Sequence, residues 1–196
     1  MLLTRQVLDR TLQWGAVVIF GGMVLNASMI QMLRPIPYPA ELLALVGFLA
    51  AGAFVWCVMD AVTSSPRRTG VRCAVGVALT AGIIQGLGGY FNPSAPAQPT
   101  FAYLLSGGVG LCGYAFARRH SAVVLVLLSA SFAWDNWPIL PPMDCVLVSS
   151  LQLIAGTVTI LVVPLLIDMA DEVERSLAAA WSEREELDRE HRRAAE

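Results

Sequence analysis

Residues 145–196, CVLVSSLQLIAGTVTILVVPLLIDMADEVERSLAAAWSEREELDREHRRAAE, join two segments of opposite character. The first segment, 145–167, has no charged side chain and meets the length of about 20 apolar residues that a helix needs to cross a membrane. The second segment, 171–196, contains nine acidic and five basic residues and neither glycine nor proline. Because proline is tolerated inside membrane-spanning helices, Pro164 need not end the helix. The stretch therefore predicts one helix that leaves a membrane and continues as a polar rod.

The rest of the chain is poor in charge. The 196 residues are 56% hydrophobic and 14% charged, whereas a typical soluble domain has about 25% charged residues. Only 14 charged residues lie in the first 170. This composition predicts an all-α integral membrane protein. The negative sign of the net charge of −2 comes from the polar rod, so it does not indicate a nucleic-acid partner.

Charge-free intervals predict six membrane-spanning helices. One long interval, 73–117, is divided by the proline-rich stretch FNPSAPAQPT at 91–100, because proline disrupts a helix interior. The expected spans are approximately residues 11–33, 42–62, 73–91, 101–117, 121–137 and 145–167. They form a six-helix membrane domain, residues 1–168, and residues 169–196 form a separate C-terminal signalling helix.

Arginine is distributed unevenly between the connections. Seven arginines lie in the N-terminal segment, in 67–72 and in 118–119, whereas the other connections contain only Arg34. Arginine-rich connections stay on the cytoplasmic side, so the N-terminus is expected there. The apolar interval 121–134 is short enough to be a re-entrant segment instead of a span. If it crosses, the chain is a multi-pass protein of the cell membrane with both termini cytoplasmic.

The connections on the outer side are the candidate sites for sensing a signal. They are too short to form an extracellular ligand-binding domain, so a signal would be met at the outer surface or within the membrane. A lipid, an amphiphile, an antibiotic or a change in the bilayer would fit. An ordinary aromatic belt at the membrane interface is the alternative interpretation. The candidate rim residues are Arg34, Tyr38, Tyr90, Trp134, Asp135, Trp137 and Asp144.

Small and polar residues interrupt the apolar spans. Gly82 and Gly86 form a GxxxG pattern, which is typical of closely packed helices in lipid; a cavity for a lipid-like ligand is the alternative. Asp60 lies near the inner end of its span and is expected to be an end-of-helix carboxylate that pairs with Arg67 or Arg68.

Residues for catalysis, metal binding or cofactor binding do not form a pattern in these 196 residues. Ser106 has no histidine within a span, which disfavours an intramembrane serine protease. His120 and His191 lie at a helix edge and on the polar rod, so they do not predict a pair of haem ligands. The four cysteines have no metal-binding spacing. We therefore expect no catalytic residue, metal site or cofactor site here.

The polar rod has a weak heptad pattern. Val173, Ala180, Leu187 and Ala194 share one heptad position, and Leu177, Arg184 and His191 share the other. An apolar position beside a mixed one predicts a weak coiled coil. The expected dimer seam comprises Val173, Leu177, Ala180 and Leu187. Signal transmission is expected through the last span, with Pro164 as a pivot just before the charged boundary at Asp168.

Six spans with short connections, followed by AAAWSEREELDREHRRAAE at 178–196, resemble the N-terminal input module of actinobacterial sensor histidine kinases with a NarL/DesK-type transmitter. The resemblance implies a homodimer, a cytoplasmic response regulator as partner, and ATP and Mg²⁺ bound only in a kinase domain beyond Glu196. His191, in REHRRAAE, lacks the sequence context of a phosphoacceptor. The alternative function is a small six-span transporter or membrane scaffold with a cytoplasmic assembly helix.

Overall fold

The computed structural model describes residues 5–33, 39–91, 102–137 and 140–195, and these residues form six α-helices with no strand among them. The all-α prediction is therefore confirmed. The helices are α1 (Arg5–Leu33), α2 (Ala40–Thr63), α3 (Thr69–Phe91), α4 (Ala102–Ala115), α5 (Arg118–Asn136) and α6 (Pro142–Ala195).

Within this described part, four helices are long and apolar enough to cross a membrane: α1, α2, α6 and the Thr69–Leu87 part of α3. By length and composition these helices are compatible with a membrane protein. The other two helices are less apolar or shorter. The 14 residues of α4 extend roughly 21 Å at 1.5 Å per residue, and α5 carries Arg118, Arg119 and Asp135 within its 19 residues.

The connection between α4 and α5 explains why α4 ends before the expected boundary at residue 117. Ser121 donates its hydroxyl hydrogen to carbonyl oxygens at the end of α4, and its oxygen lies 3.0 Å from the carbonyl of Cys112 and 2.9 Å from that of Phe116. Carbonyl groups at a helix C-terminus have no partner in their own helix. The buried Ser121 hydroxyl satisfies part of this need and lets the chain reverse direction within two residues.

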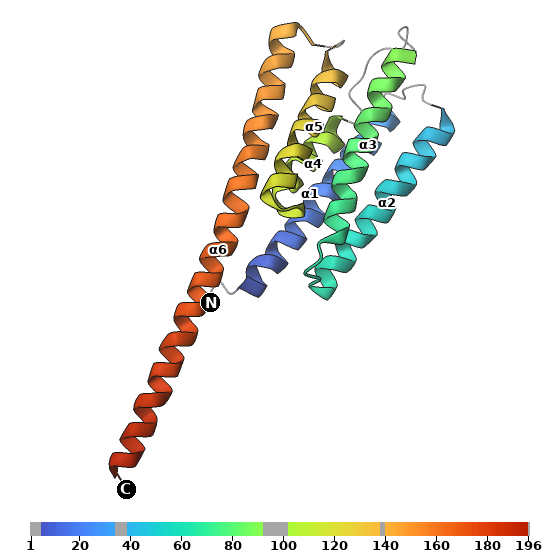
Figure 1. Ribbon diagram of the computed structural model, residues 1–196. Helices are drawn as coiled ribbons and strands as arrows, with labels where there is room; N and C mark the ends of the chain where they lie inside the picture. Colours follow the sequence, from blue (N-terminus) through green and yellow to red (C-terminus); the bar gives the residue numbers. More distant parts are fainter. Residues whose placement is uncertain (1–4, 34–38, 92–101, 138–139, 196) are drawn as a thin grey trace.

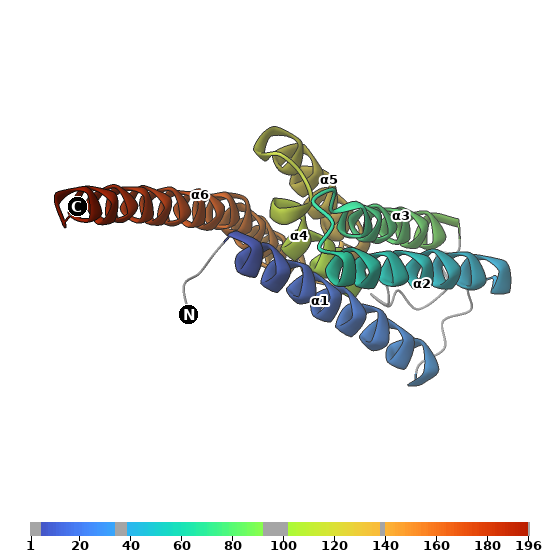
Figure 2. The same ribbon diagram turned by 90° about the horizontal axis from the view of Figure 1, so that it is seen from below.

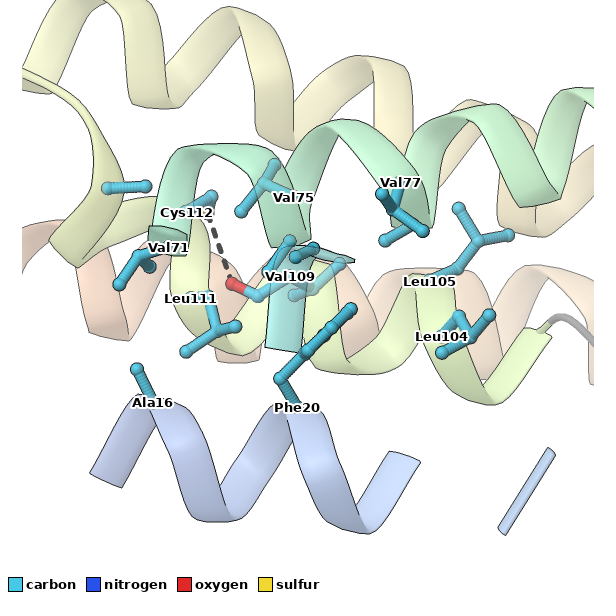
Figure 3. Close-up of a cluster of buried hydrophobic side chains, with 14 of the residues drawn as sticks. Ala16, Phe20, Val71, Val75, Val77, Leu104, Leu105, Val109, Leu111 and Cys112 are labelled. Carbon is cyan, nitrogen blue, oxygen red and sulfur yellow. Dashed lines mark hydrogen bonds between the residues drawn. The ribbon is translucent and has the colours of Figure 1, made fainter. Parts of the chain in front are cut away.

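The central helix of the bundle is α4, which packs against α1, α3, α5 and α6. Helix α2 lies outside it against α3 and α1, and α6 lies at the opposite edge (Figure 1). Figure 3 shows Ala16 and Phe20 of α1 pointing toward Leu111 and Val109 of α4. In a membrane, where the lipid is itself apolar, close packing of such side chains, and not their removal from water, would hold the helices together.

Helix α6 is a single helix of 54 residues that continues through Pro164. At 1.5 Å per residue it is roughly 80 Å long, and its C-terminal half projects away from the other five helices (Figures 1 and 2). In the most apolar stretch of α6 only 6% of the residues are buried, compared with 50% in the corresponding stretch of α3. The expected continuous helix is confirmed, and it is the span least enclosed by the bundle.

Asp60 corrects an expectation from the sequence. Its Oδ2 atom accepts a hydrogen bond of 2.7 Å from the backbone N–H of Gly70, in the first turn of α3. The first amides of a helix lack intrahelical partners and carry positive partial charge, so a carboxylate stabilises them. Asp60 therefore caps α3 and does not pair with Arg67 or Arg68. Arg68 instead forms an ion pair with Asp9 of α1 at 3.1 Å.

Candidate functional site

One end of the bundle gathers the arginines, and we call it the charged end. Arg68 Nη1 donates a 3.0 Å hydrogen bond to the carbonyl of Tyr114, and its guanidinium lies 4.1 Å from the centre of the Tyr114 ring. Arg72 Nε donates to the carbonyl of Ala115 at 2.9 Å. Because Arg68 also pairs with Asp9, the start of α1, the start of α3 and the end of α4 are tied together.

Two further ion pairs surround α6 where it leaves the bundle. Arg5 Nη1 lies 3.0 Å from both carboxylate oxygens of Asp171, and the backbone N–H of Arg5 donates to Glu174 Oε1 at 2.7 Å. Arg118 Nη2 lies 3.6 Å from Asp168 Oδ2, with both side chains largely exposed. Exposed ion pairs of this kind contribute about 0–1 kcal/mol each. They orient the exit of α6 without locking it, and they include the predicted transmission residue Asp168.

Helix α6 meets the backbone of α4 one turn before Pro164. A methyl group added to Gly113 would lie 2.5 Å from the carbonyl carbon of Thr159 and 2.7 Å from the backbone nitrogen of Ile160. Only a glycine permits this approach. Since Pro164 has no N–H, the carbonyl of Ile160 lacks its usual helical hydrogen bond. The turn of α6 that loses a hydrogen bond at Pro164 thus begins where the helix contacts Gly113 of α4.

The predicted rim residues do not all lie within the described part of the chain. Arg34 and Tyr38 are outside it, and of Tyr90 only the backbone, in α3, is described. At the ends of α5 and α6, Trp134, Trp137 and Asp144 are exposed. Asp135, in contrast, is only 4% exposed. Among the rim residues whose side chains are described, Asp135 therefore differs from the others in being buried.

Asp135 and Trp134 line a hollow between α3 and α5, which we call the α3–α5 groove. Its volume is about 300 Å³, and its lining residues are Gly82, Ile83, Gly86, Leu87, Ala130, Ser131, Trp134 and Asp135. A methyl group added to Gly86 would lie 2.5 Å from Trp134 Cδ1 and 3.1 Å from Asp135 Oδ1. The GxxxG pattern therefore provides both close packing and a hollow.

Neither carboxylate oxygen of Asp135 has a hydrogen-bond partner among the described residues, although both are buried. The neighbouring Asn136 is satisfied, because its Nδ2 donates to the carbonyl of Phe132 at 2.8 Å. A buried carboxylate without a partner destabilises a protein. Ionisable residues in membrane proteins are therefore functional candidates.

Sequence reasoning identified Asp135 and Trp134 but not their opposite wall, Ile83 and Leu87, because nothing in the sequence pairs α3 with α5. It also missed Arg5 and Asp9, and it treated Asp168 as a boundary and not as a partner of Arg118. The sequence offered one signal for these ion pairs. Charged residues expected at the same boundary of a membrane lie at the same depth, so they are candidates for pairing.

Other chemistry finds no support in the described ranges. No group of three or more histidine, cysteine, aspartate or glutamate side chains there could hold a metal ion. Ser106 Oγ accepts a 2.9 Å hydrogen bond from Gln152 Nε2, which joins α4 to α6.

Comparison with known proteins found no matching family model, no similar curated protein and no similar solved structure.

Proposed function

We propose that the chain is the membrane signal-input module of a two-component sensor histidine kinase. In this proposal the outer end of the bundle detects an envelope or intramembrane signal, and α6 passes it to a cytoplasmic pair of helices. The observation that carries the proposal is the continuity of α6, in which a poorly buried apolar half and an exposed charged half form one helix.

Six crossings with cytoplasmic termini agree with the arrangement of the charged end. The starts of α1, α3 and α5 and the end of α4 meet there through Arg68, Arg72 and Arg118, and α6 passes the same level at Asp168. Successive helices therefore run in opposite directions, as six crossings require. Concentrating arginine at one end favours a cytoplasmic position for that end.

The contacts of α6 suit the transmission of a small movement. Gly113 provides a contact point for α6 at Thr159 and Ile160, and Pro164 weakens the next turn. Beyond this point the described restraints on the helix are few: the buried Ala170, the contacts of Arg5 with Asp171 and Glu174, and the exposed pair of Arg118 with Asp168. A displacement of the outer half of α6 could then tilt or rotate the polar rod at a low cost in free energy.

The polar rod is proposed to form a parallel homodimer. Val173, Ala180 and Leu187 are exposed, and Leu177 is partly covered. Isolated helices of this length are only marginally stable in water, so a second copy would stabilise the rod. A seam with one mixed position can also change its register readily.

A fusion protein tests this function. Residues 1–196 are joined to the dimerisation and ATP-binding domains of a sensor histidine kinase, with zero to seven residues inserted at the junction. Helical transmission predicts that ATP-dependent autophosphorylation rises and falls with a period of about seven residues. In the active fusion, Gly113→Ala should shift the output by at least fivefold, because the added methyl group displaces α6.

The matched control is Gly110→Ala, on the same helix, where an added methyl group meets nothing within 4 Å. It should leave the output unchanged. Autophosphorylation that is independent of junction length would overturn the proposal and would favour the alternative, a small transporter or scaffold. Substrate flux into proteoliposomes containing the unfused chain would then be the measurement of choice.

A further inference from the structure

The α3–α5 groove contains a buried carboxyl group that has no cationic partner among the described residues. Asp135 lines the groove, is 4% exposed, and has no partner for either oxygen in the described part of the chain. Every arginine that the structure describes lies at the charged end or on the polar rod. Arg118 is 17 residues away along α5, roughly 25 Å at 1.5 Å per residue. The described bundle therefore leaves the positive charge to a ligand.

An indole ring lies beside this carboxylate. The position that a methyl group on Gly86 would occupy is 2.7 Å from Trp134 Nε1 and 3.1 Å from Asp135 Oδ1. The two groups thus pack side by side against Gly86. Tryptophan is the aromatic residue that attracts ammonium groups most strongly, and a carboxylate adds a direct ion pair. Together they have the chemistry to recognise an ammonium group.

The remaining walls of the groove are apolar and accessible from outside the bundle. Ile83 and Leu87 of α3 are each 50% exposed, and Trp134 is 64% exposed. A volume of about 300 Å³ is at the small end of the range for ligand-binding sites. One aliphatic chain fits this space better than the body of a two-chain lipid does. A ligand can enter sideways from the bilayer.

We propose that the α3–α5 groove binds a single-chain cationic amphiphile, with its ammonium group held between Asp135 and Trp134 and its chain along Ile83 and Leu87. This inference deepens the proposed function by naming the class of signal that the outer end detects.

Photolabelling of the 196-residue chain in nanodiscs of lipids without net charge tests this inference. The probe is a dodecyl chain with a diazirine and a trimethylammonium head, compared with the same chain carrying an alcohol head. Saturable labelling of 82–87 and 130–135 is expected, at least tenfold stronger with the ammonium head. Unlabelled dodecyltrimethylammonium should compete for it. Equal labelling by the two probes would overturn the inference. So would a result in which phosphatidylethanolamine competes for labelling and dodecyltrimethylammonium does not.

Asp135→Asn should reduce labelling by the ammonium probe at least tenfold while leaving the fold intact, since the amide has the same size. The matched control is Asp144→Asn, which removes an exposed carboxylate nearby at the start of α6 and should leave labelling unchanged. Undiminished labelling of Asp135→Asn would contradict the proposed ion pair. Because no kinase domain takes part, a negative result here leaves the input-module proposal standing, and a failed fusion leaves the binding result standing.

Discussion

Two aspartates are buried at opposite ends of the bundle, and they differ in what surrounds them. Asp60, 8% exposed, accepts a hydrogen bond from the backbone of Gly70. Asp135, 4% exposed, has no partner in the described part of the chain. The charged end thus uses its buried carboxylate to hold two helices together. The opposite end keeps a buried carboxyl group that contacts no described partner, which is the arrangement expected of a binding site and not of a structural contact.

The largest effect is expected from removing the partnered carboxylate. Asp60→Ala leaves the buried N–H of Gly70 unsatisfied and should lower the free energy of unfolding by about 2 kcal/mol. Unfolding by sodium dodecyl sulfate in mixed micelles is the measurement. Asp60→Asn keeps an acceptor oxygen and should lose less than half as much. Equal losses for the two variants would show that the charge, and not the hydrogen bond, is what matters.

A smaller effect of opposite sign is expected at the other end. Asp135→Asn replaces an unpartnered buried carboxyl group by an amide, which is less costly to bury when the carboxylate is charged. The ligand-free protein should therefore gain about 1 kcal/mol in the same unfolding experiment at alkaline pH, where the carboxyl group is ionised. A loss of stability would reveal a partner for Asp135 outside the described residues, such as Arg34, and would remove the contrast between the two aspartates.

The smallest effect on stability is expected at the exposed ion pair between Arg5 and Asp171. Arg5→Ala should change the free energy of unfolding by less than about 1 kcal/mol. It should nevertheless broaden the distance distribution between spin labels at Thr63 and Glu183, because the polar rod loses its restraint.

Arg175→Ala is the control for this change, since its partner Glu172 lies within α6 itself. The distance distribution should stay as narrow as in the unchanged protein. Identical broadening in the two variants would show that the exit of α6 is not held by Arg5.

The expected spans illustrate how far the sequence alone reaches. The boundaries of α1, α2 and α3 agree with the apolar intervals within a few residues, apart from the N-terminal extension of α1 to Arg5. The boundaries of α4 and α5 also agree within three residues, but the form of the turn between them depends on Ser121 reaching carbonyls of the preceding helix. Local hydropathy does not contain such a contact.

The candidate site was predicted only in part. Trp134 and Asp135 were identified from their position after an apolar run, but the sequence did not predict that Trp134 is exposed and Asp135 buried. The pairing expected for Asp60 was wrong, since charge suggested a nearby arginine and the geometry supplied a backbone amide instead. Gly113 received no role at all, because its importance depends on which helix lies against it.

The sequence by itself determined the helices, the continuity of α6 and the uneven distribution of arginine. Each follows from local properties: the length of an apolar run, the absence of breakers and the position of charges. The tertiary structure decided which faces of these helices meet, and hence that Asp135 lies unpartnered beside Trp134 in the α3–α5 groove. The physical reason is that helices apolar all round have no polar face to mark their orientation. Small residues such as Gly86 and Gly113 set the contacts instead, and they act only once two helices lie together.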